Sequence, residues 1–158
     1  MDMNKETVII VDDEEMVLTS LSTYLILVTD YDVVTFTSAA RALEYIEAHD
    51  VGIIISDFLM PEMDGIAFLA KAKELRPDAP RVILTGYADK ENAIKAINQV
   101  GLYQYVEKPW DNDDLRLIIR NGLERKLLLT KLSQKIEQIN QAYSELQSLQ
   151  QEILKAFA

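Results

Sequence analysis

The sequence predicts an α/β protein built on a doubly wound, five-stranded parallel sheet. Between residues 7 and 125, five short apolar runs of strand length alternate with amphipathic segments of helical length. Regular alternation with short connections is typical of a parallel sheet that carries helices on both faces. A closed barrel of such units would need roughly 250 residues, and this chain has 158. An open sheet is therefore expected.

Three of the five expected strands, the first, third and fourth, are nearly unbroken apolar runs, and the run of the third indicates burial on both faces. The third strand passes through three consecutive isoleucines into a single acid, Asp57. Pro61 holds the residue before it extended, and Asp64-Gly65 is turn material, so this strand must end near Asp57. The expected strands are residues 7–11, 32–36, 51–57, 81–86 and 102–109.

Helices are expected after each strand, because apolar residues there recur at helical spacing. Ser38 is the expected cap of the second helix, and Gly101 the expected end of the fourth. Asp111 or Asn112 is expected to cap the last. The single histidine, His49, lies at a helix exit, where a surface position is expected rather than a catalytic one.

The composition excludes several classes of function. Without cysteine, the chain has no disulfide, thiolate chemistry or zinc–thiolate site. The apolar runs are only strand-sized, so we expect no transmembrane segment, no signal peptide and a cytoplasmic protein. Residues 1–114 carry 22 acidic and 9 basic side chains, which argues against binding nucleic acid there. Residues 115–158 carry 4 acidic and 7 basic side chains, a balance typical of a solvated helix face.

Reactive side chains follow four of the five expected strands. Asp12 and Asp13 follow the first, Asp57 ends the third, and Thr85 and Lys108 end the fourth and fifth. The carboxyl ends of parallel strands meet at one edge of the sheet, where ligands bind, so we expect these groups to lie together. Three neighbouring carboxylates repel one another unless a cation lies among them. Oxygen ligands without His or Cys favour Mg²⁺.

This set of groups suits phosphoryl transfer. A hard cation, the Lys108 ammonium and the Thr85 hydroxyl would together neutralise the oxygens of a transferring phosphoryl group. The carboxylate of Asp57 can itself be the nucleophile and become an aspartyl phosphate. A lone Asp after a strand more often only opens a turn, so the hypothesis depends on the whole ordered set. We expect Thr85 and Lys108 to face solvent and to matter for signalling more than for folding.

From about Thr7 to Arg125 the chain resembles the receiver domain of bacterial two-component response regulators. The resemblance lies in the acidic pair, in Asp57 with the Met60-Pro61-Glu62-Met63-Asp64-Gly65 that follows, in Thr85 and in Lys108-Pro109. It implies a flavodoxin-like sheet with strand order 2-1-3-4-5. It also implies that a sensor histidine kinase phosphorylates Asp57, and that the domain is a signal receiver rather than an enzyme.

The resemblance further implies a role for each site residue. The Leu59 backbone carbonyl would complete the Mg²⁺ site, and Tyr105 matches the aromatic residue that turns inward on activation. Leu59 and Tyr87 match two positions that tune dephosphorylation, and a pair this bulky suggests a long phosphoryl lifetime. The implied site consists of Asp12, Asp13, Asp57 and Leu59 around the metal, with Thr85, Tyr105 and Lys108 around the phosphoryl group.

Residues 126–158 are expected to form a coiled-coil helix continuous with the last helix of a receiver domain in residues 1–125. Apolar residues recur there in steps of three and four over about four heptads, with a polar Gln150 at one core position. Leu128, Leu149 and Leu154 widen this face only locally, so a helix folded back on its own domain is the less favoured alternative. We expect a parallel homodimer whose seam contains Leu129, Leu132, Ile136, Ile139, Tyr143, Leu146 and Ile153.

Gly122 is the expected weak point of this helix, because glycine costs about 1 kcal/mol in a helix interior, and a bend there would let the receiver rotate. An output domain, which the family usually adds, is expected to be either missing or cut off here, and the chain resembles regulators whose output enzyme follows a coiled coil. Two other functions stay open. A phosphatase of the haloacid-dehalogenase type needs a second acid where this chain has Leu59. An adaptor would use the coiled coil alone, without phosphorylation.

Overall fold

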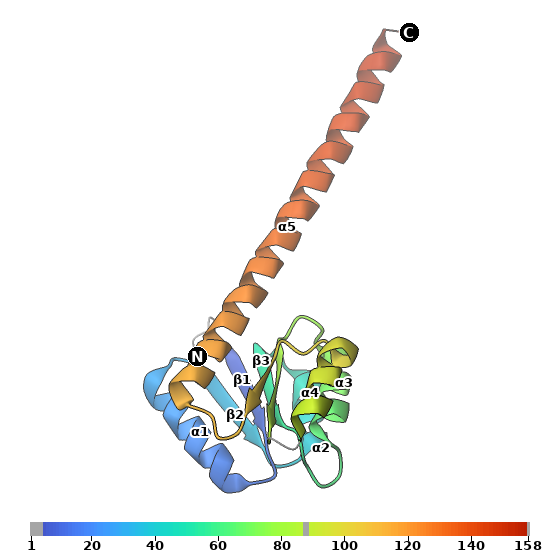
Figure 1. Cartoon of the computed structure of the whole chain (residues 1–158). Coiled ribbons are helices and arrows are strands. Elements are labelled where there is room, and N and C mark those ends of the chain that lie inside the picture. Colours follow the sequence, from blue (N-terminus) through green and yellow to red (C-terminus); the bar gives the residue numbers. More distant parts are fainter. Residues whose placement is uncertain (1–4, 87–88, 158) are drawn as a thin grey trace. The chain divides into compact units, whose positions relative to one another are not determined.

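The computed structural model describes residues 5–86 and 89–157, in which five strands alternate with five helices (Figure 1). The strands form one parallel sheet in the order β2-β1-β3-β4-β5. The predicted fold class and strand order are confirmed. The elements are β1 (Thr7–Val11), α1 (Glu15–Val28), β2 (Asp32–Phe36), α2 (Ala39–Ala48), β3 (Ile53–Asp57), α3 (Gly65–Leu75), β4 (Arg81–Thr85), α4 (Lys90–Val100), β5 (Gln104–Glu107) and α5 (Asn112–Ala156).

Two apolar clusters hold the sheet between its helices. One packs α2, α3 and α4 against one face of the sheet, around Phe68 and Ile54. The other packs α1 and the start of α5 against the opposite face, around Leu21 and Ile53. Strand β3 is the central strand, and all five of its residues are buried. Apolar side chains therefore leave the strand on both faces, as its unbroken run of isoleucines predicts.

The helix boundaries agree with the caps expected from the sequence. The Ser38 side chain accepts a hydrogen bond from the Arg41 backbone N–H at 3.4 Å. Gly101 ends α4 with φ 67°, in the left-handed region that glycine favours. Of the two candidates for the last cap, Asp111 is the one used, because its carboxylate accepts from the N–H groups of Asp113 and Asp114. His49 lies exposed at the exit of α2.

Helix α5 passes through Gly122 without a break, so this glycine does not end the helix as a flaw in it would. Gly122 is buried, and a Cβ atom there would lie 3.1 Å from Ile53 Cδ1 and 3.2 Å from Tyr103 Cε1. The missing side chain lets the helix approach the sheet closely. Tight packing against the sheet is therefore the physical reason for glycine at this position, despite its low helix propensity.

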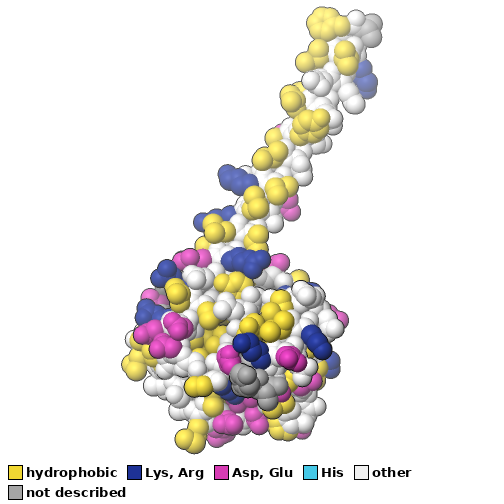
Figure 2. Space-filling model, in the orientation of Figure 1, with side chains coloured by type: hydrophobic (Ala, Val, Ile, Leu, Met, Phe, Trp, Pro, Cys, Tyr) yellow, Lys and Arg dark blue, Asp and Glu magenta, His cyan; other side chains and the backbone are white. Residues whose placement is uncertain are grey.

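The chain divides into two compact units, Met1–Lys126 and Leu127–Ala158. Taken by itself, the second unit is helical, and Figure 2 shows apolar side chains recurring along it. The seven predicted seam residues are 49% to 65% exposed. That a second copy of this helix covers these residues in a dimer stays a prediction. Among the helices of the described residues, none is both long enough and apolar enough to cross a lipid bilayer.

Candidate functional site

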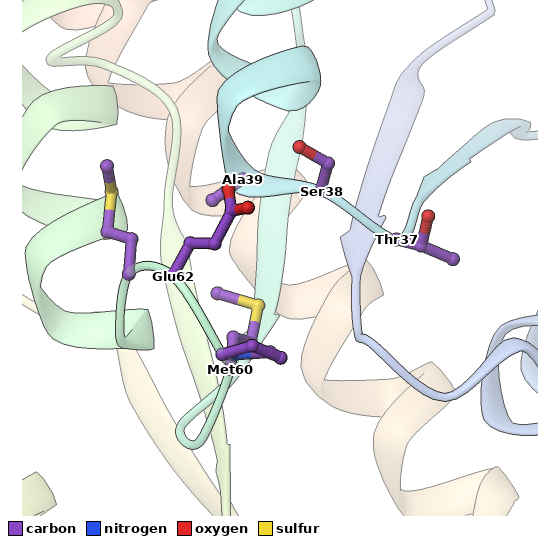
Figure 3. Close-up of a pocket in the computed structure, with 7 residues that line it drawn as sticks. Thr37, Ser38, Ala39, Met60 and Glu62 are labelled. Carbon is purple, nitrogen blue, oxygen red and sulfur yellow. The ribbon is translucent and has the colours of Figure 1, made fainter.

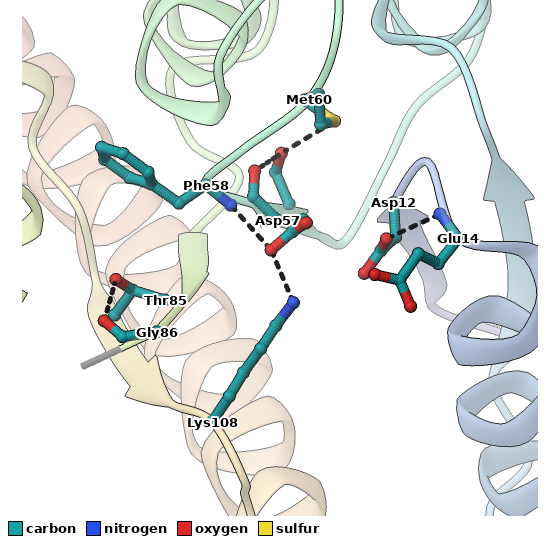
Figure 4. Close-up of polar contacts among 9 residues, drawn as sticks. Asp12, Glu14, Asp57, Phe58, Met60, Thr85, Gly86 and Lys108 are labelled. Carbon is teal, nitrogen blue, oxygen red and sulfur yellow. Dashed lines mark hydrogen bonds and ion pairs between the residues drawn. The ribbon is translucent and has the colours of Figure 1, made fainter. Parts of the chain in front are cut away.

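Asp57 lies at the carboxyl end of β3, where the central strand leaves the sheet (Figure 4). Its side chain is largely buried, and its Oδ1 atom accepts a hydrogen bond from the Phe58 N–H at 3.0 Å. The ammonium group of Lys108, which follows β5, lies 2.8 Å from the same oxygen. The structure thus brings together two site residues that are far apart in the sequence, as the topology predicts.

Gly65 allows the chain after Asp57 to turn back tightly onto the end of β3. A Cβ atom at this position would lie 2.1 Å from the Asp57 carbonyl oxygen, which is far inside any possible contact. The Gly65 N–H donates to the Phe58 carbonyl at 2.8 Å, and α3 begins at this residue. The sequence indicated only a turn here. The close approach to the strand end was not predictable, because it depends on how α3 packs.

Asp12, Asp13 and Asp57 each place a carboxylate oxygen within 4.8 Å of the other two. Asp12 is fully buried, and its Oδ1 atom accepts from the Glu14 N–H at 2.9 Å. Its Oδ2 atom is also buried and has no hydrogen-bond partner within residues 5–86 and 89–157. A buried carboxylate oxygen without a donor is unfavourable unless a cation or water meets it.

Burial and neighbouring charges shift the pKa values of Asp12 and Lys108. Burial raises the pKa of Asp12 from 3.8 to about 6, and the nearby negative charge of Asp57 adds to this effect, while the Glu14 N–H opposes it. Burial lowers the pKa of Lys108, but the hydrogen bond and ion pair with Asp57 and the charges of Asp12 and Glu14 outweigh it, and the pKa is raised. Lys108 therefore stays an ammonium group.

The acidic residues fit a hard divalent cation. Their donor atoms are all carboxylate oxygens, the set that Mg²⁺ prefers over softer metals. The unpartnered Oδ2 atom of Asp12 points to the same conclusion, because an ion would satisfy it. Leu59, whose carbonyl the resemblance assigns to this site, follows Asp57 by two residues and has a side chain that is 61% exposed. Its part in metal binding stays a prediction.

Thr85 departs from the expectation of a solvent-facing residue. It ends β4, which lies between β3 and β5, and its side chain is fully buried. Its hydroxyl donates to the Gly86 carbonyl at 3.1 Å (Figure 4). The Lys108 N–H donates to the Thr85 carbonyl at 2.8 Å. The interior position of β4 in the sheet is the physical reason for this burial. Substitutions at Thr85 must therefore be judged as core substitutions.

The two remaining predicted site residues are Tyr105 and Tyr87. Tyr105, in β5, is half-buried and packs against the apolar cluster that contains α2, α3 and α4. Tyr87, the second of the two positions expected to tune dephosphorylation, lies outside the described residues. A residue that the sequence did not single out, Ser56, is fully buried beside Asp57 and donates to its carbonyl at 2.9 Å.

A separate hollow of about 180 Å³ lies between the loops that follow β2 and β3 (Figure 3). Met60 and Glu62 from the second loop and Thr37 and Ser38 from the first contribute to its lining. Its lining does not include Asp57, Asp12 or Lys108. The hollow is therefore distinct from the carboxylate cluster. The full lining is Thr37, Ser38, Ala39, Met60, Pro61, Glu62 and Met63.

The fold and the arrangement of these residues define a receiver-type signalling domain. The family model of the response regulator receiver domain matches residues 8–120. The chain therefore belongs to the family of response regulator receiver domains.

Comparison with individual proteins gives the same family. The chain is 34% identical over 118 residues to the hydrogenase transcriptional regulatory protein HoxA of Bradyrhizobium diazoefficiens, covering 75% of this chain but 24% of that protein. It is 32% identical over 153 residues to the response regulator protein TmoT of Ectopseudomonas mendocina, covering 96% of this chain and 69% of the relative. Among solved structures, the adenylate cyclase from Rhodopirellula baltica matches with a TM-score of 0.79 and 28% identity, over 84% of this chain and 98% of that one.

Proposed function

We propose that this chain is a phosphorylation-activated receiver in which Asp57 accepts a phosphoryl group from a sensor histidine kinase, with Mg²⁺ bound. The observation that carries the proposal is the position of one carboxylate between a cation site and a fixed ammonium group. Asp57 shares a 4.8 Å cluster with Asp12 and Asp13, and its Oδ1 atom lies 2.8 Å from Lys108 Nζ. Phosphoryl transfer requires this combination of nucleophile and fixed positive charge.

In the proposed transfer, an Asp57 carboxylate oxygen forms a bond to phosphorus while the phosphorus–nitrogen bond of a phosphohistidine breaks. The leaving imidazole is neutral, because its other nitrogen already carries a proton. Asp12, Asp13, Asp57 and the Leu59 carbonyl would hold Mg²⁺, which when bound offsets charge on the phosphoryl oxygens. Lys108 supplies a positive charge close enough to follow those oxygens. The domain acts only on itself, through this transfer and a slow loss of the phosphoryl group.

The switch residues take their proposed roles from their positions around this carboxylate. Thr85 would turn its hydroxyl from the Gly86 carbonyl to the phosphoryl group. Tyr105, which is half-buried at the adjacent strand, would turn inward with it. Leu59 and Tyr87 would control the access of water to the phosphoaspartate, and hence its lifetime. These roles are those that the family resemblance assigns.

We further propose that the signal passes along α5 to an output module outside this chain, through a parallel homodimer of the second unit. The apolar seam from Leu129 to Ile153 supports this, because one helix alone leaves it about half exposed. The chain spans about a quarter of the length of the first curated relatives it matches, HoxA of two species. The names of these relatives describe transcriptional regulators, and that output is a property of those longer proteins.

Incubation of the chain with Mg²⁺ and acetyl phosphate tests the phosphoacceptor. The proposed receiver forms a stable acyl phosphate, and Asp57→Asn abolishes it. The matched control is Asp78→Asn, at an exposed loop position, which should label as the wild type does. An adaptor would take up no label, and a phosphatase would release free phosphate without retaining any. Either result, or full labelling of Asp57→Asn, would contradict the proposal.

A further inference from the structure

The last turns of α5 within the first unit contact the amino ends of β3 and β5. Gly122 lies against Ile53, the first residue of β3, and against the ring of Tyr103, which precedes β5. The Arg125 guanidinium lies over that ring, 5.6 Å from its centroid. Lys126 Nζ donates to the Val51 carbonyl oxygen at 2.8 Å. We call this set of residues the α5 clasp: Val51, Ile53, Tyr103, Gly122, Arg125 and Lys126.

The same two strands carry the candidate site at their other ends. Strand β3 runs from Ile53 in the clasp to Asp57, a span of about 13 Å at the usual rise per residue. Strand β5 is preceded by Tyr103 and followed by Lys108. The ion pair of Lys108 with Asp57 therefore joins the carboxyl ends of two strands whose amino ends are both held by α5.

The packing between these two ends leaves little room for independent movement. Every residue of β3 is buried, and the strand is hydrogen-bonded to β1 on one side and to β4 on the other. At the clasp, a methyl group on Gly122 would require the side chains of Ile53 and Tyr103 to give by a few tenths of an ångström. Close-packed interiors transmit a displacement rather than absorb it. A shift of β3 at the site is therefore transmitted toward α5.

We propose that the α5 clasp couples the phosphorylation state of Asp57 to the end of α5 in the first unit, with Tyr103 as its central positioning residue. The inference rests on the proposed function of Asp57. A phosphoryl group on Asp57 draws Lys108 from the carboxylate to the phosphoryl oxygens. This replaces the ion pair that joins the carboxyl ends of β3 and β5. The clasp, which fits the unphosphorylated arrangement, then loosens. No contact with the second unit is needed for this step.

Thermodynamic linkage makes the coupling measurable at the site itself. If phosphorylation loosens the clasp, then loosening the clasp must strengthen the binding of a phosphoryl analogue at Asp57 by the same factor. Lys126→Met removes the bond to Val51 and keeps the length of the side chain. Tyr103→Leu removes the ring that contacts Gly122 and Arg125. The matched controls are Tyr103→Phe, which keeps the ring, and Lys131→Met, at an exposed lysine of the same helix.

The experiment is a calorimetric titration of the full chain with beryllofluoride and Mg²⁺, together with hydrogen exchange of residues 120–128. We expect Lys126→Met and Tyr103→Leu to bind the analogue about fivefold or more tightly than the wild type, the lower range of typical coupling. Both controls should keep the wild-type affinity, and the analogue should speed exchange at residues 120–128 of the wild type.

Unchanged or weaker binding by Lys126→Met and Tyr103→Leu would overturn the coupling while leaving the phosphoacceptor intact. If Tyr103→Leu does not fold, Lys126→Met alone decides, because it truncates no packed side chain. A wild-type chain that does not bind beryllofluoride at all would contradict the proposed function, and the coupling with it. The two failures are therefore distinguishable in one titration series.

Discussion

Lys108 Nζ lies 2.8 Å from Asp57 Oδ1, and this contact joins the carboxyl ends of β5 and β3. The two side chains are 31% and 10% exposed, so the pair is screened less than a surface ion pair. Asp57 also faces the negative charges of Asp12 and Asp13. Lys108 is therefore the one cation, among the described residues, that the structure places on this carboxylate.

Replacing Lys108 with Ala should separate phosphorylation from its consequences. We expect Asp57 still to label with acetyl phosphate and Mg²⁺, more slowly, while the changes in hydrogen exchange that follow labelling disappear. Loss of the pair should lower the free energy of unfolding by only about 1 kcal/mol, since Lys108 is partly exposed. Urea unfolding measures this, with Lys90→Ala, from an exposed ion pair with Glu107, as the control. If Lys108→Ala simply fails to fold, its role is structural.

Replacing Asp12 with Asn should stabilise the metal-free protein at neutral pH. The folded-state pKa of Asp12 is raised from 3.8 to about 6, so its contribution to stability is complete below pH 3.8 and is lost as the pH rises through about 6. The Asn variant escapes this loss, which is on the order of 3 kcal/mol.

Thermal melts from pH 4 to pH 8 in a chelator test the effect of Asp12. The two proteins should melt alike at pH 4, and Asp12→Asn should melt higher at pH 8. Adding Mg²⁺ should raise the melting temperature of the wild type and not that of the variant, because the variant has lost a ligand. A variant that is less stable at pH 8 in the chelator would show that the carboxylate serves the fold instead of an ion.

Replacing Gly65 with Ala should damage the site through the backbone. The new Cβ atom would lie 2.1 Å from the Asp57 carbonyl oxygen, so the strand end or the start of α3 must move. We expect a loss of about 2–4 kcal/mol in the free energy of unfolding, typical of severe packing and backbone strain, and slower labelling of Asp57. Gly86→Ala is the matched control, because the nearest atom that its Cβ atom would meet among the described residues is Asp89 Oδ2, at 4.0 Å. Equal effects of the two substitutions would contradict this account.

Replacing Ile136 with Asp should dissociate the proposed dimer of the second unit. Ile136 is a core position of the predicted seam, and burying such a side chain contributes about 1.5–3 kcal/mol. The dimer dissociation constant should therefore rise about tenfold or more in sedimentation experiments. Gln134→Asp adds the same charge on the opposite side of the predicted heptad and should have little effect. A chain that is monomeric before any substitution would remove the coiled coil from the account.

The sequence predicts the fold well because the inner strands β1, β3 and β4 are mostly apolar runs that a sheet interior satisfies, and all five strands alternate with helical segments. The order of Asp12, Asp13, Asp57, Thr85 and Lys108 at successive strand ends predicts their grouping for the same reason, since the topology fixes which ends meet. The contact of Lys108 with Asp57 follows directly from that topology. These features depend on chain order and periodicity, which a single sequence contains.

The features that the sequence did not predict depend on how elements pack. The sequence indicates that Gly122 weakens the helix, but in the structure this glycine permits close contact of α5 with Ile53 and Tyr103. Gly65 reads as a turn residue but allows the approach of α3 to the Asp57 carbonyl. Thr85 was expected in solvent and is buried between neighbouring strands. Distances between elements decide all three, and periodicity carries no information about those distances.

The measurement that tests the central claim most directly is the location of the acyl phosphate in the chain. After labelling with acetyl phosphate and Mg²⁺, borohydride converts a phosphoaspartate to homoserine, which peptide mass spectrometry can place. The account predicts homoserine at position 57 and at no other aspartate. Homoserine at Asp12 or Asp13, or none in a chain that binds Mg²⁺, would contradict it.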